Sequence, residues 1–261
     1  MDSVNYIINF LKHKLKAKNQ HGIHSPFVFD LYNNVLANRI PFYIFDDIES
    51  IRAKLLLSPQ NITITDLGAG SKKMASNRRK IADITKYTSK KPKIAQLLFR
   101  LVNYLKPQTI LELGTSVGIS SMYMAASNSR AKVITVEGDP KIAQIAQINF
   151  DKLKFKNIRL INKSFEAFFE HDFDKIDRLD FVFIDGNHQY ASTINYFNKI
   201  KPKLHEKSIV IIDDIYWSKE MTKAWKELCA LLEVTVSIDI FEMGFLFFKP
   251  GQVKEHFFLK I

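Results

Sequence analysis

Residues 110–118 read Ile-Leu-Glu-Leu-Gly-Thr-Ser-Val-Gly, and this stretch decides the fold. Ile110–Leu113 is a short apolar run with one acid, Glu112, and a helical pattern opens at Ser120. The order predicts a strand, a tight glycine turn and a helix. Because glycine lets a backbone approach a ligand closely and a helix N-terminus offers free N–H groups, the turn is a candidate ligand site.

The next apolar run, Val133–Val136, ends in a second acid, Glu137. An acid at this position of a βαβ unit can accept both ribose hydroxyls of a nucleoside. The dinucleotide fingerprint needs glycine where Ser116 stands, and the chain has no Gly-x-x-x-x-Gly-Lys-Ser/Thr pattern. A pyrophosphate would therefore fit poorly, and a P-loop is excluded. The alternative is a glycine turn in an ordinary α/β domain, but the spacing and the second acid favour a nucleoside-containing ligand.

A second glycine loop competes with the first. Residues 61–70 also read as a strand leading into the turn Gly68-Ala69-Gly70, but a polar, basic run follows over 71–80. No apolar-faced helix and no acid-tipped strand come next. We interpret this segment as a basic loop before the core domain, either a lid or a plain surface turn.

Length and composition limit the class of protein. The 261 residues, 46% of them hydrophobic, fit one α/β domain with an N-terminal extension. The chain has a single cysteine, Cys229, so it cannot form an internal disulfide, and a reducing compartment is indicated. Cys229 lies in a helical pattern, and we interpret it as a buried packing residue and not as a nucleophile. We find no apolar run of about 18 residues, so we expect no transmembrane helix and a cytoplasmic location.

The net charge of +11 is unevenly distributed. Residues 1–108 contain 18 Lys and Arg against 7 Asp and Glu, whereas residues 109–261 contain 20 of each. A basic segment can mark an anionic partner such as nucleic acid, an acidic membrane surface or an acidic substrate. The alternative is a set of solvated lysines, and the chain has no recognised RNA-binding motif.

Hydrophobic periodicity predicts the order of the elements. We expect helices in the N-terminal part, including an amphipathic basic helix from Val4 to Leu15 that packs on its own domain. Strands are expected near 109–113, 132–136, 157–161, 180–184 and 207–212, and helices near 27–36, 42–57, 93–105, 119–127, 140–150, 165–170, 190–200 and 219–232. Val234–Phe241 and Phe245–Phe248 predict a closing hairpin joined by Glu242-Met243-Gly244. The pattern favours an α/β fold with a doubly wound, mostly parallel, seven-stranded sheet that ends in an antiparallel hairpin.

Three carboxylates stand where predicted strands end. Asp185 follows 181–184, and Asp213 and Asp214 follow 209–212. The C-terminal edge of a doubly wound sheet is where ligands bind, and close carboxylates repel one another unless a cation or proton lies between them. A hard divalent ion, most simply Mg²⁺, would satisfy them. The alternative is helix N-capping, which explains one or two acids better than three.

His188 stands three residues after Asp185, and Gly186 permits a tight turn between them. Such a turn would direct the imidazole back over the strand edge. Histidine has an ordinary pKa of about 6.5, which suits a general base near neutrality. A surface histidine at a helix start is the alternative.

Four segments carry a resemblance to a known family: Leu111–Ser120, Val133–Glu137, Leu179–Asp185 and Ile211–Asp214. They look like class I S-adenosylmethionine-dependent methyltransferases of the catechol O-methyltransferase-like branch, over roughly residues 92–250. Residues 1–91 look like the N-terminal extension of some bacterial members, which implies a methyltransferase domain over 92–261.

The resemblance implies roles residue by residue. Ser120 would meet the methionyl carboxylate, Glu137 the ribose, and Ser164 the adenine. The metal ligands would be Asp185, Asp213 and Asp214. The cofactor-binding set would be Glu112, Gly114, Thr115, Ser116, Gly118, Ser120, Glu137, Gly138, Ser164 and Asp185.

Two positions depart from the pattern of this family. The third metal ligand is commonly Asn where Asp214 stands, and the catalytic lysine is replaced by His188, which with Asp185 becomes the expected catalytic pair. Both departures put a catechol substrate in doubt.

The function expected from the sequence is transfer of a methyl group from S-adenosylmethionine to a hydroxyl of a small molecule, with the help of a divalent cation. One rival is an RNA methyltransferase that grips phosphates with its basic N-terminal part. A second rival is a non-catalytic cofactor-binding or interaction module. The sequence is compatible with assembly of the chain into a homodimer.

Overall fold

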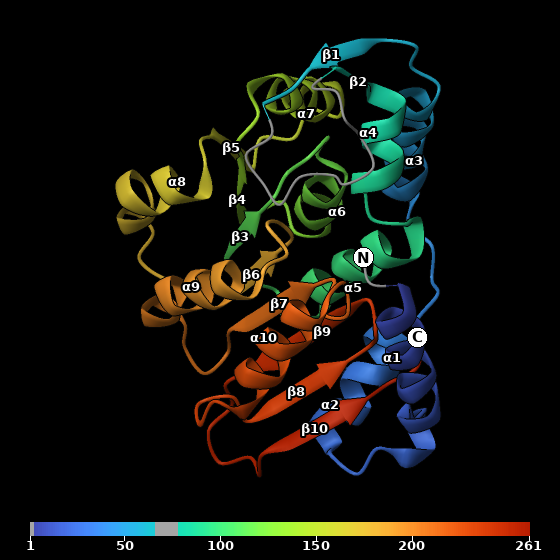
Figure 1. Ribbon diagram of the computed structural model, residues 1–261, viewed down its shortest axis with the longest axis vertical. Helices are drawn as coiled ribbons and strands as arrows, with labels where there is room; N and C mark the ends of the chain where they lie inside the picture. Colours follow the sequence, from blue (N-terminus) through green and yellow to red (C-terminus); the bar gives the residue numbers. More distant parts are fainter. Residues whose placement is uncertain (1–2, 66–77) are drawn as a thin grey trace. The chain divides into compact units, whose positions relative to one another are not determined.

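The computed structural model describes residues 3–65 and 78–261 (Figure 1). The turn Gly68-Ala69-Gly70 lies outside the described residues, so the interpretation as a lid or surface turn stays a prediction. The chain divides into two units: unit 1 combines Met1–Asn38 with Asp177–Ile261, and unit 2 is Arg39–Ile176. The segment predicted as an N-terminal extension is thus shared between the units, with the division at Asn38.

Unit 2 contains three parallel strands in the order β3, β4, β5. Leu113 of β3 is paired with Val136 of β4, and Glu137 of β4 with Asn162 of β5. The bounds are β3 (Thr109–Leu113), β4 (Lys132–Glu137) and β5 (Ile158–Asn162), each followed by a helix, α6 (Ile119–Ser127), α7 (Pro140–Lys152) and α8 (Phe165–His171). The interior of β3 is fully buried, as expected for a parallel strand covered on both faces.

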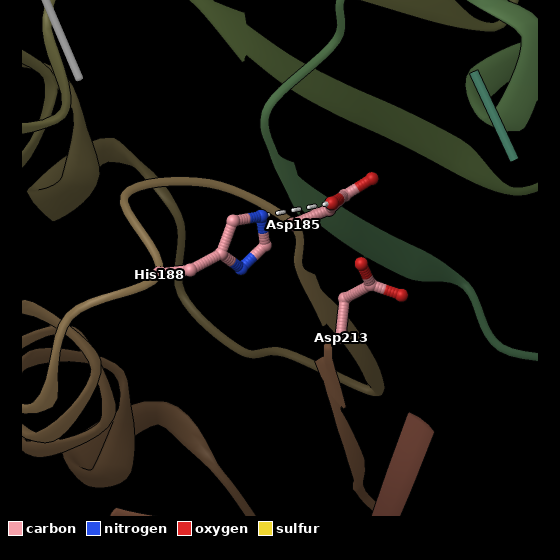
Figure 2. Close-up of side chains that lie close together, drawn as sticks. All are labelled: Asp185, His188 and Asp213. Carbon is pink, nitrogen blue, oxygen red and sulfur yellow. Dashed lines mark ion pairs between the residues drawn. The ribbon is translucent and has the colours of Figure 1, made fainter. Parts of the chain in front are cut away.

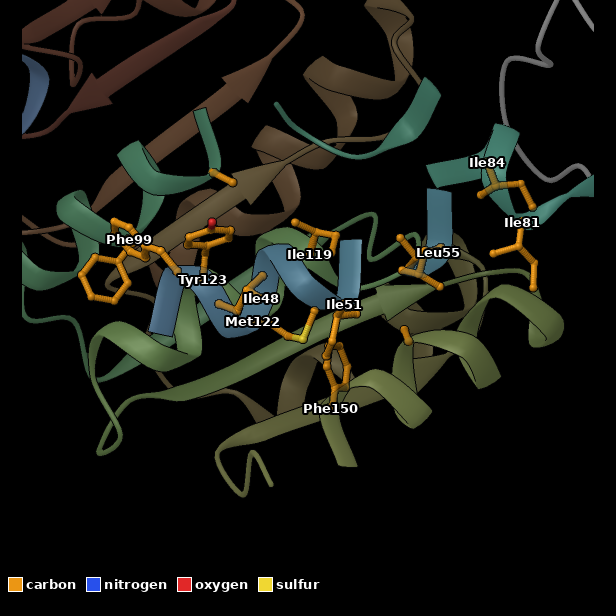
Figure 3. Packing of buried hydrophobic residues seen from close by; sticks show 14 of the residues in the cluster. Ile48, Ile51, Leu55, Ile81, Ile84, Phe99, Ile119, Met122, Tyr123 and Phe150 are labelled. Atoms are coloured by element: carbon orange, nitrogen blue, oxygen red, sulfur yellow. The ribbon is translucent and has the colours of Figure 1, made fainter. Parts of the chain in front are cut away.

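Helices from the sequence before β3 complete the core of unit 2 (Figure 3). Ile48 and Ile51 of α3 belong to one buried cluster with Met122 and Tyr123 of α6 and Phe150 of α7. The members of the cluster on α3, which include Phe45 and Leu55, are spaced by three or four residues and therefore lie on one face of that helix. The remaining elements of unit 2 are α3 (Tyr43–Leu56), β1 (Asn61–Thr63), β2 (Arg78–Lys80), α4 (Ile81–Thr88), α5 (Pro92–Leu105) and the 3₁₀ turn η3 (Phe173–Lys175).

Unit 1 contains the remaining strands of the predicted series. β6 pairs with β7 in parallel, and β9 pairs antiparallel with both β7 and β8. The bounds are β6 (Phe181–Ile184), α9 (Tyr190–Ile200), η4 (Lys201–Lys203), β7 (Ile209–Asp213), α10 (Lys219–Ala230), β8 (Val236–Asp239) and β9 (Met243–Phe247). Alternating strands and helices that close in an antiparallel hairpin confirm the predicted Rossmann-like α/β class.

The start of the chain supplies further helices to unit 1. Their bounds are α1 (Ser3–Lys16), η1 (Gln20–Gly22), α2 (Pro26–Leu31) and the π-helical turn η2 (Tyr32–Leu36). Ser25 caps α2, because its hydroxyl accepts a hydrogen bond from the Val28 N–H. None of the helices in the described part of the chain is both long and apolar enough to cross a membrane.

Three details differ from the sequence prediction. Met243 and Gly244, expected in the hairpin turn, belong to β9, where a side chain on Gly244 would come within 2.4 Å of the Trp225 ring. An additional strand, β10 (Glu255–Phe258), pairs with β8 in parallel. Residues 78–80, expected in a basic loop, form β2 and pair antiparallel with β1.

Candidate active site

The glycine turn after β3 has the conformation that its sequence predicts. Gly114, Ser116 and Gly118 have positive φ angles of 105°, 48° and 85°. The N–H groups of Gly114 and Thr115 donate to the Val136 carbonyl at 3.1 and 3.2 Å, which ties the turn to the end of β4. A side chain on Gly118 would also meet the Phe150 ring at 2.5 Å. Glycine at position 118 is therefore required by backbone conformation and by packing.

Glu137 lies at this turn, as predicted for a ribose-binding acid. One carboxylate oxygen accepts the Ser116 N–H at 2.9 Å, and the other accepts the Asp139 N–H at 3.0 Å. The side chain is only partly buried, so oxygen lone pairs remain for a ligand. Burial raises the pKa of Glu137, while the hydrogen bonds from Asp139 and Ser116 oppose that rise.

The other strand ends of unit 2 converge near Glu137. The Asn162 side chain donates to the carbonyls of Glu137 and Gly138 at 2.8 and 3.2 Å, which joins the ends of β5 and β4. Ser164 follows and caps α8, since its hydroxyl accepts the Ala167 N–H at 3.2 Å. The structure thus places Gly138 and Ser164 beside the strand ends; their contacts with a cofactor stay predictions.

Glu112 has a different environment from the one expected of a cofactor-contacting acid. Its side chain is fully buried, and the hydroxyls of Ser120 and Thr135 donate to it at 2.5 and 2.6 Å, together with that of Ser121. In this arrangement its carboxylate is not accessible to a ligand. Burial raises the pKa of Glu112 to about 7, although the three hydroxyl donors favour the charged form. Glu112 therefore positions the first turn of α6.

The hydroxyl groups of Thr115 and Ser120 also point into the protein. Thr115 is 1% exposed, and its hydroxyl lies 2.6 Å from that of Thr135. Ser120 is 6% exposed and donates to Glu112. Any contact of these two residues with a cofactor would therefore use their backbone atoms or require rotation of the side chains.

Unit 1 carries a cluster of carboxylates and a histidine (Figure 2). Asp185 follows β6, Asp213 is the last residue of β7, and His188 lies in the loop before α9. One ligand atom from each of the three lies within 4.8 Å of the others. The Nε2 atom of His188 is 3.7 Å from the Asp185 carboxylate and 3.8 Å from that of Asp214. The structure thus brings together three of the predicted site residues, Asp185, His188 and Asp213.

The backbone explains how these side chains reach one another. The left-handed residue in the loop after β6 is Asn187, with φ 49°, and not the glycine before it. The Asn187 amide donates to the hydroxyls of Ser192 and Tyr196 at 2.9 and 3.2 Å, which fixes the loop on α9. Sequence reasoning assigned this turn to Gly186 and missed the asparagine, although Asn tolerates left-handed backbone better than most residues.

Asp214 is placed differently from Asp185 and Asp213. It has a φ of 52°, its N–H donates to the Glu242 carbonyl at 2.9 Å, and its side chain is 37% exposed. It is not among the three residues whose ligand atoms meet within 4.8 Å. Its role as a metal ligand stays a prediction, which is supported by its position near His188.

The donor set of the cluster suits a divalent cation. Asp213 is 2% exposed, so two neighbouring carboxylates lie where water screens their repulsion poorly. Carboxylate oxygens favour Mg²⁺ or Mn²⁺, and an imidazole nitrogen in the set would shift the preference away from Mg²⁺. The residues therefore fit a divalent cation: Mg²⁺ or Mn²⁺ where the carboxylates alone bind it, and a softer transition metal where the imidazole also binds.

Sequence reasoning also missed Tyr6 in α1. Burial raises the pKa of Tyr6, and the negative charges of Glu242 and Asp214 raise it further, so the phenol lies near the acidic end of β7. Its ring packs edge-on against Phe241 at 5.0 Å. No signal in the sequence connects residue 6 with residue 214, because the link is tertiary.

Comparison with known proteins agrees with the geometry. Residues 111–215 match a family model described as a methyltransferase domain. An O-methyltransferase from Bacillus cereus in complex with S-adenosylhomocysteine superposes with a TM-score of 0.57 at 16% identity, over 85% of this chain and 97% of that one. The S-adenosylmethionine complex of TomG, an O-methyltransferase of Streptomyces achromogenes involved in tomaymycin synthesis, gives 0.57 at 13%, over 85% and 95%. S-adenosylhomocysteine-bound PaMTH1, a methyltransferase of Podospora anserina, gives 0.55 at 16%, over 82% and 99%.

The fold, the glycine turn with its acid partner and the domain match point to the same class of protein. Residues 111–215 match a methyltransferase domain, and the chain shares its fold with solved O-methyltransferases that bind S-adenosylmethionine or S-adenosylhomocysteine.

Proposed function

We propose that this enzyme transfers the methyl group of S-adenosylmethionine to a hydroxyl oxygen of a small molecule, with a divalent cation held in unit 1. The observation that carries the proposal is the cluster of Asp185, His188 and Asp213, whose ligand atoms lie within 4.8 Å of one another. It combines two features that hydroxyl activation needs, a site for a cation and a proton acceptor.

The residues of unit 2 would hold the cofactor. Glu137 would accept the ribose hydroxyls, and the Gly114–Gly118 turn would let the methionyl part approach the backbone closely. S-adenosylmethionine supplies an already activated electrophilic methyl group, so positioning provides most of the rate enhancement.

The residues of unit 1 would hold and deprotonate the acceptor. Asp185 and Asp213, with Asp214, would hold the cation, which when bound lowers the pKa of the acceptor hydroxyl. His188 Nε2 would take the hydroxyl proton. Trp217, 40% exposed with its indole centroid 6.3 Å from the imidazole centroid, offers a flat surface against which the acceptor can pack.

A labelling experiment tests the proposed function. The protein is incubated with methyl-labelled S-adenosylmethionine, Mg²⁺ or Mn²⁺ and a metabolite extract, and the labelled product is identified. We expect a methyl ether of a small hydroxylated compound. Label on nitrogen, sulfur or RNA would contradict the proposal.

Glu137→Ala is expected to weaken cofactor binding by about 1.5–3 kcal/mol, which is roughly a 10- to 150-fold higher Kd. The variant removes an acceptor of charge-assisted hydrogen bonds to the ribose. Calorimetry with S-adenosylhomocysteine measures the change, with Glu170→Ala, whose side chain is 72% exposed, as the matched control. Equal affinities for wild type and Glu137→Ala would refute the ribose contact.

Adding Mn²⁺ or Mg²⁺ to metal-free protein is expected to raise its thermal stability. At ten times the Kd, the gain is about 1.4 kcal/mol in the free energy of unfolding. Asp213→Asn should abolish this gain because it removes a charged ligand, whereas Asp151→Asn on α7 should keep it. The metal-bridged mechanism is wrong if full activity survives exhaustive chelation.

A further inference from the structure

Helix α1 has an apolar face that is used inside unit 1. The ring centroids of Tyr6 and Phe10 lie 5.0 and 5.1 Å from the ring centroid of Phe241. His13 is buried, and its Nε2 atom lies 3.1 Å from the carbonyl oxygen of Asp239. These contacts fix the helix on the turn between β8 and β9. The side of α1 that carries Tyr6, Phe10 and His13 therefore packs on unit 1, although Phe10 is still 44% exposed.

The opposite side of α1 is also apolar, and it faces solvent. Its side chains recur at spacings of three and four residues, which places them on a single face. They are Val4, Ile7, Ile8, Leu11 and Leu15, with exposed fractions of 68%, 57%, 43%, 53% and 88%. Scattered exposed apolar residues are ordinary, but a continuous stripe on the outer face of a helix marks an interaction surface.

The charged side chains of α1 are of one sign. Lys12 follows Ile8 by one turn and Lys14 follows Ile7 by two turns, so both lysines border the stripe, and both are exposed. Lys16 and Lys18 extend the positive charge beyond it. Residues 3–16 contain no Asp or Glu.

We propose that α1 docks this enzyme on an anionic lipid surface. An apolar face bordered by lysines is the pattern of a helix that lies in a membrane interface, with its apolar side in the acyl boundary and its ammonium groups among the anionic head groups. A second copy of the chain fits the stripe less well. Pairing two such helices would bring lysines together with no acid on either helix to neutralise them.

Vesicle co-sedimentation with the full-length chain tests this proposal. We expect the protein to bind vesicles of mixed phosphatidylcholine and phosphatidylserine, and to bind vesicles of phosphatidylcholine alone much more weakly. Binding to the mixed vesicles should fall at high salt, because salt screens the attraction between the lysines and the anionic head groups. The double variant Ile7→Ser, Leu11→Ser should lower the affinity for the mixed vesicles about tenfold or more, because it removes apolar surface from the binding face. Lys12→Gln, Lys14→Gln should remove most of the preference for phosphatidylserine.

The matched control is Leu232→Ser, which alters a side chain that is 92% exposed elsewhere in unit 1 and should leave binding unchanged. Thermal unfolding confirms that each variant folds, which is expected because the altered side chains do not form the core. Equal binding to both vesicle types, or wild-type binding by the Ile7 and Leu11 double variant, would overturn the proposal. So would a wild-type dimer that this double variant dissociates in sedimentation equilibrium, because the stripe would then bind a second copy.

Discussion

Replacing His188 with alanine is expected to lower turnover about 10²–10⁴-fold while the affinity for S-adenosylmethionine changes little. The imidazole Nε2 lies 3.7 Å from Asp185 and 3.8 Å from Asp214, at the strand ends where an activated hydroxyl would bind. Without it, the proton must leave to water. The expected loss is in kcat, since His188 belongs to unit 1 and the turn proposed to bind the cofactor belongs to unit 2.

The same variant separates two roles for His188. If His188 acts only as a proton acceptor, His188→Ala should keep the metal-induced gain in thermal stability. As a metal ligand, its removal should reduce that gain together with turnover. His171→Ala, with a side chain that is 57% exposed, is the matched control and should keep both properties. Wild-type turnover in His188→Ala would show that metal activation suffices or that another group, such as Lys219, accepts the proton.

The parts of the fold that could be predicted are those with a strong local signal. The run from Ile110 through Gly118 combines a buried apolar strand with glycines at positive φ, and it folds as expected. By contrast, β2 is only Arg78–Lys80, a short basic strand in which two of the three residues are exposed and which has no apolar alternation. β10 begins with Glu255 and His256, which are exposed, so its pattern does not differ from that of a loop.

The site was predictable at the level of strand ends and not at the level of side-chain direction. Parallel strands place their C-terminal acids at one edge, which is why Asp185 and Asp213 meet. The left-handed backbone of Asp214 and the turn at Asn187 depend on contacts with Glu242, Ser192 and Tyr196. The Asp214 contact joins residues far apart in the sequence, and the Asn187 contacts join a loop to the following helix, so the pattern of apolar residues does not predict either one.

Glu112 shows the same limit in a different way. An acid in the first strand of a nucleoside-binding unit reads as a ligand contact, but here the chain encloses it with hydroxyl groups from α6 and β4. An enclosed carboxyl group makes the stability of the protein depend on pH. That dependence has a definite sign because burial raises the pKa of Glu112 to about 7.

Between about pH 4.5, the ordinary pKa of the group, and about pH 7, folded protein holds a proton on Glu112 that the unfolded chain has released. Stability falls with rising pH wherever the folded state binds more protons. The contribution of Glu112 is therefore fully present below pH 4.5 and is lost as pH rises through 7. The loss expected from this one group is about 3 kcal/mol in the free energy of unfolding.

Glu112→Gln should remove this dependence, because glutamine has nearly the same shape and no charge at any pH. From pH 4.5 to pH 8, the stability of the variant relative to wild type should rise by about 3 kcal/mol. Urea unfolding at a series of pH values measures the difference, which cancels the titration of every other group. Glu170→Gln, at an exposed position, should give a difference that stays flat. Parallel curves for wild type and Glu112→Gln would mean that the three hydroxyl donors hold the Glu112 carboxylate charged throughout, so that their hydrogen bonds outweigh the cost of burial.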